Sequence, residues 1–148
     1  MQSILTTKMN VLLYLAWLIA VAAIVGSLYF SNVLGLPPCD LCWWQRIFTY
    51  PIAVLLLVGL WRKDVNVPYY VIPLAGIGLL FAVYHNLIYE GIIPEAIQTC
   101  TNGVSCTTPL VELFGFVSIP LLSLLAYGGI LVLNGAYIVL VRRQQKAI

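Results

Sequence analysis

Four long stretches of the chain contain no Asp, Glu, Lys or Arg: residues 9–39, 47–61, 65–89 and 113–141. A helix that crosses the hydrocarbon core of a bilayer needs about 20 mostly apolar residues. The sequence therefore predicts four membrane-spanning helices, at about 11–34, 43–61, 69–89 and 116–140. The second is the shortest, and it can start at Trp43 only if Arg46 lies at the membrane edge.

Composition supports a membrane protein over a very apolar soluble one. The chain is 62% hydrophobic and only 8% charged, whereas soluble domains carry about 25% charged residues. A net charge of +2, without a long basic cluster, argues against nucleic-acid binding. We expect an all-α, integral membrane, antiparallel four-helix bundle that forms one domain over 1–148, with outer loops at 35–42 and 90–115.

The basic residues predict the orientation of the bundle. Cytoplasmic loops of membrane proteins carry an excess of Lys and Arg, and four spans place both termini on one side. Arg46 is the one basic residue expected on the opposite side. The six on the predicted cytoplasmic side are Lys8, Arg62, Lys63, Arg142, Arg143 and Lys146. The first span could instead be a cleaved signal peptide, but its apolar run exceeds the usual core of about 7–15 residues.

The four cysteines form two pairs, Cys39 with Cys42 and Cys100 with Cys106, and both pairs fall in the predicted outer loops. One interpretation is two structural disulfides, which persist on the outer side of a membrane. A four-cysteine zinc site is a second, although the spacing of the loop pair is wider than usual, and we predict no metal. The third is thiol–disulfide exchange, because Cys-x-x-Cys is the usual redox spacing and a helix N-terminus stabilises a thiolate.

Two further ionisable residues are candidates for the same site. Arg46 follows Cys42 by four residues and so shares its helical face. It could stabilise a thiolate or a reduced cofactor, or it could simply extend its charge to the interface. His85 lies near the outer end of the third span. It could bind a cofactor oxygen or carry a proton, or it could be a packed histidine, although ionisable groups within membranes are functional suspects.

The segment Cys39-Asp-Leu-Cys-Trp-Trp-Gln-Arg46 resembles the C-x-L-C-x-x-Q-R signature of the DsbB family of membrane disulfide bond formation proteins. The likeness extends over nearly the whole chain, since the signature opens the second of four spans and a second cysteine pair follows between spans three and four. Only five residues separate Cys100 from Cys106. This is more similar to the compact BdbC-type members than to enterobacterial ones. The short spacing argues against a large movement of Cys106 across to the first pair, but it leaves a mixed pairing of Cys39 with Cys106 open.

The resemblance implies a bacterial cell-membrane thiol oxidase that works outside the cytoplasm. A DsbA-like, thioredoxin-fold partner would attack the loop disulfide, at Cys100. The electrons would pass to Cys39 and Cys42. The Cys42 thiolate would then deliver them to a membrane quinone, menaquinone or ubiquinone, held near Arg46 and His85.

Three other functions fit parts of the sequence. Proteins similar to vitamin K epoxide reductase place the loop pair before Cys-x-x-Cys, the reverse of the order here. A membrane scaffold or transporter subunit with structural disulfides would give no reason for Gln45 and Arg46 after the motif. A heavy-metal carrier would hold stoichiometric metal on reduced thiols.

Overall fold

The computed structural model of the protein describes residues 2–93 and 118–146. These residues form four α-helices and one short π-helical segment, with no strand among them. The elements are α1 (Gln2–Leu28), η1 (Tyr29–Val33), α2 (Asp40–Arg62), α3 (Val67–Tyr89) and α4 (Ile119–Lys146). The predicted all-α four-helix bundle is confirmed.

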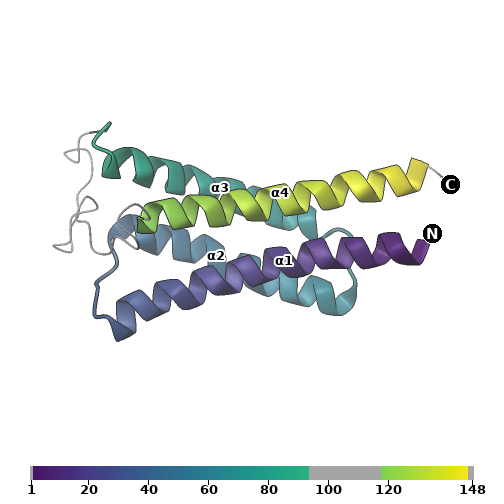
Figure 1. Ribbon diagram of the computed structural model, residues 1–148, viewed down its shortest axis with the longest axis horizontal. Coiled ribbons are helices and arrows are strands. Elements are labelled where there is room, and N and C mark those ends of the chain that lie inside the picture. Colours follow the sequence, from purple (N-terminus) through teal and green to yellow (C-terminus); the bar gives the residue numbers. More distant parts are fainter. Residues whose placement is uncertain (1, 94–117, 147–148) are drawn as a thin grey trace.

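The four helices run along one common axis, and each packs on two neighbours (Figure 1). The main contacts join α1 to α2, α2 to α3, α3 to α4 and α4 back to α1. Neighbours run in opposite directions, so both termini lie at one end of the bundle, beside the turn between α2 and α3 (Figure 1). The connection from α1 to α2, which leads into the first cysteine pair at the start of α2, lies at the other end (Figure 1).

All four helices are long and apolar enough to cross a bilayer. The candidate spans are Asn10–Val33, Asp40–Arg62, Val67–Tyr89 and Ile119–Lys146. The second span, expected at 43–61, is longer than the sequence suggested, because α2 begins inside the cysteine motif at Asp40. The helix thereby gains the length that the apolar run alone lacks.

Large apolar side chains cover the outside of the bundle. Leu80 is 69% exposed, Val132 is 70% exposed and Trp61, at the end of α2, is 86% exposed. In water such a surface would promote aggregation, whereas lipid tails solvate it. The chain is a multi-pass membrane protein.

Small side chains let the helices approach closely inside the bundle. Ala16 and Ala20 of α1 and Ala75 and Ala82 of α3 are fully buried, as is usual where transmembrane helices pack. Gly78 of α3 serves one particular contact, because a Cβ atom there would overlap with the ring of Tyr127 from α4. This close packing brings the Tyr127 hydroxyl to α2, where it meets the candidate site.

Candidate functional site

The first cysteine pair lies at the start of α2. The chain reaches it through Pro37 and Pro38, which cannot continue a helix. Cys39 is the N-cap residue with an extended backbone (φ −69°, ψ 166°), and Cys42 lies in the first turn. Their side chains therefore share one face, and the Cys39 thiol donates a hydrogen bond to Cys42 Sγ at 3.2 Å. Cys39 is buried and Cys42 is partly exposed, so Cys42 is the more accessible sulfur.

His85 reaches this pair from α3. Its Nε2 atom lies 3.8 Å from Cys39 Sγ, and its Nδ1 atom lies 3.4 Å from the side-chain amide of Gln45. The ring is 2% exposed. The two sulfurs and a ring nitrogen of His85 all lie within 4.8 Å of one another. The histidine thus contacts the cysteine pair directly, on the side of Cys39.

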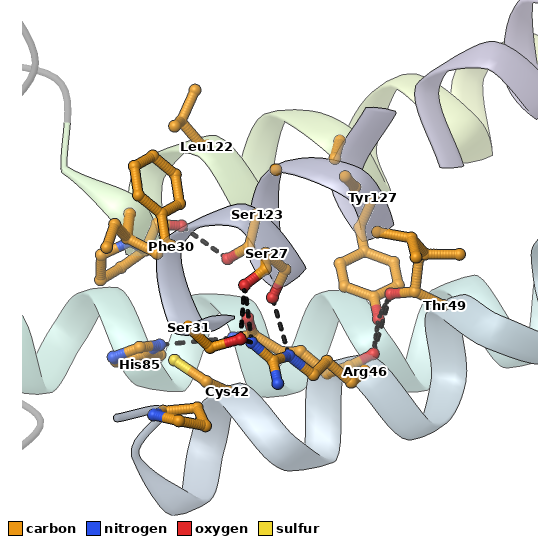
Figure 2. Close-up of a pocket in the computed structure, with 18 of the residues that line it drawn as sticks. Ser27, Phe30, Ser31, Cys42, Arg46, Thr49, His85, Leu122, Ser123 and Tyr127 are labelled. Carbon is orange, nitrogen blue, oxygen red and sulfur yellow. Dashed lines mark hydrogen bonds between the residues drawn. The ribbon is translucent and has the colours of Figure 1, made fainter. Parts of the chain in front are cut away.

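Arg46 is held by the end of the first span rather than extended to the membrane surface. Its Nε donates to Ser27 Oγ at 2.8 Å, and its Nη2 donates to the Ser27 carbonyl at 2.7 Å and to Ser31 Oγ at 3.0 Å. The guanidinium also lies over the Trp43 ring, 5.3 Å from its centre. Figure 2 shows the side chain inside the bundle, with the serines above it and Cys42 on the same helix.

The π-helical segment helps to form this cradle. Ser31 lies within η1, and Ser27 lies one turn earlier, at the end of α1. Ser31 Oγ also donates to the Ser27 carbonyl at 3.1 Å, which fixes both serines relative to Arg46. In the described part of the chain, no carboxylate pairs with the guanidinium and no acceptor bonds its Nη1. The positive charge of Arg46 and the two N–H groups of its Nη1 atom are therefore available to a ligand.

Gln45 is fixed from α4. The Tyr127 hydroxyl donates to the Gln45 carbonyl at 2.6 Å, and it lies 2.8 Å from the hydroxyl of Thr49, which itself donates to that carbonyl at 2.8 Å. These buried bonds tie α2 to α4 one turn below the cysteines (Figure 2). The Gln45 side chain is left to face His85.

A cavity of about 390 Å³ opens beside these residues. Its polar end is formed by the cysteine pair, Arg46 and His85. Side chains of α1 and α4 form its apolar wall. They include Ile19, Ala22, Ala23, Leu122, Ala126 and Ile130. The cavity can hold a molecule with a polar head at the sulfurs and an apolar body between two helices.

Four of the six residues predicted from sequence thus meet at one place: Cys39, Cys42, Arg46 and His85. The other two, Cys100 and Cys106, lie outside the described residues. Sequence reasoning missed the Ser27 and Ser31 cradle, the Gln45 contact and the Tyr127 bond. The serines left a signal, because two hydroxyls four residues apart share one face of an otherwise apolar helix.

Known proteins are similar to this chain along most of its length. The family model described as "Disulfide bond formation protein DsbB" matches residues 9–137. "Probable disulfide formation protein C 2" of Bacillus anthracis is 44% identical over 131 residues, which cover 88% of this chain and 91% of the relative. "Disulfide bond formation protein C" of Bacillus subtilis (strain 168) is 40% identical over 119 residues, 79% and 85% of the two chains. "Probable disulfide formation protein" of Deinococcus radiodurans is 45% identical over 130 residues, 82% and 84%. No solved structure matches the chain significantly.

Proposed function

The chain belongs to the DsbB family of disulfide bond formation proteins, and from this premise we propose that it is a membrane thiol oxidase that links exported dithiol proteins to a quinone. The family makes it an oxidoreductase that acts in disulfide bond formation. The further steps of the proposal are that its electrons leave to a membrane quinone, and that they arrive from an extracytoplasmic, thioredoxin-fold partner.

The observation that carries the quinone proposal is one cavity that joins the cysteine pair to an apolar wall. A quinone has a flat ring with two carbonyl oxygens and an isoprenoid tail. The free N–H groups of Arg46 are suited to a carbonyl oxygen, since charged donors make strong hydrogen bonds. The wall between α1 and α4 is suited to the tail, and Ala22 and Leu122 within it are exposed on the lipid side. The residues present therefore fit the group.

The protein's own residues have separate roles in this reaction. Cys42 is the more exposed of the two cysteines and lies with Arg46 at the polar end of the cavity, so it is the sulfur that meets the electron acceptor. His85, next to Cys39, takes up or returns a proton when that sulfur changes state. Closing the Cys39–Cys42 disulfide releases two electrons and two protons, and a bound quinone supplies an acceptor for both. Arg46 orients that acceptor and balances negative charge.

The loop pair, Cys100 and Cys106, receives the electrons from outside. A reduced DsbA-like partner attacks the Cys100–Cys106 disulfide through one thiolate and forms a mixed disulfide, which its second thiol resolves. The dithiol left on the loop then reduces the Cys39–Cys42 disulfide by the same exchange. Each exchange passes one electron pair on, so the partner emerges oxidised.

The charge distribution supports a location in the bacterial cytoplasmic membrane with both termini inside. Arg62 and Lys63 end α2, and Arg142, Arg143 and Lys146 end α4. Both helix ends lie with the termini at one end of the bundle (Figure 1). The cysteine end is the opposite one. With the positive end in the cytoplasm, the cysteines face the compartment in which exported proteins acquire disulfides.

A turnover assay tests this function. The purified protein in detergent is mixed with a reduced thioredoxin-fold dithiol protein and a soluble quinone, and the quinone absorbance is followed. We expect the wild type to consume quinone, and both Cys42→Ser and Cys100→Ser to stop it. If folded wild-type protein leaves several quinones and several dithiol donors unreacted, the oxidase proposal is wrong and structural disulfides replace it.

A further inference from the structure

The cysteine pair and His85, which have redox roles in the proposed function, also form a set of ligands for a metal ion. Cys39 and Cys42 present two sulfurs from one turn of α2, and His85 adds a ring nitrogen from α3, all within 4.8 Å. Thiolates and imidazole are preferred ligands of thiophilic ions such as Zn(II) and Cu(I). This set differs from the four-cysteine site considered from the sequence, because its third ligand comes from a helix rather than from the loop pair.

Two of the three distances between the ligand atoms can be compared with those that zinc imposes, and the third, from Cys42 Sγ to the His85 ring, is within 4.8 Å. A tetrahedral ion with Zn–S of about 2.3 Å and Zn–N of about 2.0 Å separates two sulfurs by about 3.8 Å, and a sulfur from a nitrogen by about 3.5 Å. His85 Nε2 already lies 3.8 Å from Cys39 Sγ. The sulfurs, 3.2 Å apart, need to separate by about 0.6 Å, which a small rotation of the Cys42 side chain provides.

The surroundings complete such a site. Histidines that bind metals usually donate their second ring N–H to a fixed acceptor. The Gln45 amide, 3.4 Å from Nδ1, supplies that acceptor when its oxygen faces the ring, since a side-chain amide can turn over. The cavity is lined by all three ligands, so water within it can supply a fourth. Two thiolates also cancel the charge of a divalent ion, so no net charge is buried.

We propose that the reduced Cys39–Cys42 pair and His85 bind a thiophilic cation, represented by Zn(II), and that the bound ion holds the enzyme in an inactive, reduced state. Binding converts two thiols to two metal-bound thiolates and releases two protons, with no change of oxidation state. The disulfide form has no thiolate to offer and binds nothing. While the ion is bound, neither sulfur can form the disulfide or meet an electron acceptor.

Binding is measured directly on the tag-free, reduced protein in detergent. Cys100→Ser and Cys106→Ser are combined as the parent variant, so that no other thiol contributes. We expect one Zn(II) per chain in the reduced parent and none after oxidation to the Cys39–Cys42 disulfide. Co(II) in place of Zn(II) should show the visible bands of a tetrahedral ion together with thiolate charge transfer.

Variants of the third ligand decide whether the site is specific. We expect His85→Ala to weaken Zn(II) binding at least tenfold, and His85→Cys, which offers another soft ligand, to restore it. Tyr84→Phe is the matched control on α3 and should bind as the parent does. Circular dichroism and gel filtration identify any variant that fails to fold. Equal binding by the oxidised parent, or His85→Ala binding within threefold of the parent, would overturn the proposal.

Inhibition by the bound ion is tested separately on the wild type. Only this part of the proposal, and not the binding of the ion, rests on the proposed function. Zn(II) at the concentration that saturates the parent should stop quinone consumption, and a chelator should restore it. Binding without inhibition would refute the inactive state. Absence of turnover before zinc is added would instead refute the oxidase function, while the direct binding measurement would still decide the metal site.

Discussion

Replacing Arg46 with methionine tests the role of the cavity most directly. Methionine keeps much of the length and apolar contact of the arginine stem but removes the charge and every donor. Ser27 and Ser31 keep their bond to each other, since Ser31 Oγ donates to the Ser27 carbonyl. The change therefore removes the charged group from the polar end of the cavity and leaves the apolar wall in place.

The size of the effect follows from the free N–H groups. A hydrogen bond from a charged donor contributes about 1.5–3 kcal/mol. If Nη1 binds a carbonyl oxygen of the quinone, its loss should raise the KM for quinone by about 10- to 150-fold. Stability should change less, because removing a buried cation without a carboxylate partner also removes its desolvation cost. The KM for the dithiol partner should stay the same.

The assay compares quinone consumption at varied quinone and fixed partner with the reverse titration. Arg62→Met is the matched control, because Arg62 is exposed at the opposite end of α2. Arg46→Lys keeps the charge but loses the forked guanidinium that contacts α1. Its quinone KM should lie between those of Arg46→Met and Arg62→Met. A quinone KM within twofold of the wild type for Arg46→Met would show that Arg46 only joins α1 to α2.

Three other changes test the packing around the site. Gly78→Ala places a Cβ against the Tyr127 ring and should lower the unfolding free energy by about 1–3 kcal/mol. Gly76→Ala is the control, because a Cβ there has nothing within 4 Å, and it should not lower the unfolding free energy. Equal thermal midpoints for the two variants would contradict this packing. Tyr127→Phe loses its bond to the Gln45 carbonyl and should cost about 1 kcal/mol, read from the same thermal unfolding; an unchanged midpoint would argue against the bond. Gln45→Leu removes the contact that orients His85, and the loss of one neutral hydrogen bond should slow oxidation of the first cysteine pair about 3- to 10-fold. Single-turnover kinetics measure this rate, and an unchanged rate would leave the amide without a role.

Much of the fold was accessible from the sequence because its causes are local. A backbone in lipid must satisfy its own hydrogen bonds, so each long uncharged stretch had to become a helix. The start of α2 was also local, since Pro37 and Pro38 stop the preceding segment and a Cys-x-x-Cys spacing at a helix start puts both sulfurs on one face. Arg46 joined them for the same reason, one turn further on.

The rotation of the helices about their axes was not accessible. In a soluble helix the polar face marks the side that points outward, but a helix in lipid is apolar all round, so its pattern does not show which side faces the bundle. His85 was therefore visible as a suspect, while its contact with Cys39, 46 residues away, was not. The hydrogen bond from Arg46 to the Ser27 carbonyl could not be predicted either, for the same reason.

The sequence by itself thus determined that there are four spans, which end of them carries Cys39 and Cys42, and the chemistry that those sulfurs can perform. Only the tertiary structure decided what surrounds them. In it His85 contacts Cys39, Ser27 accepts hydrogen bonds from Arg46, and an apolar cavity lies between α1 and α4. The physical reason is that the close packing of small side chains, and not hydropathy, determines which faces of the helices meet.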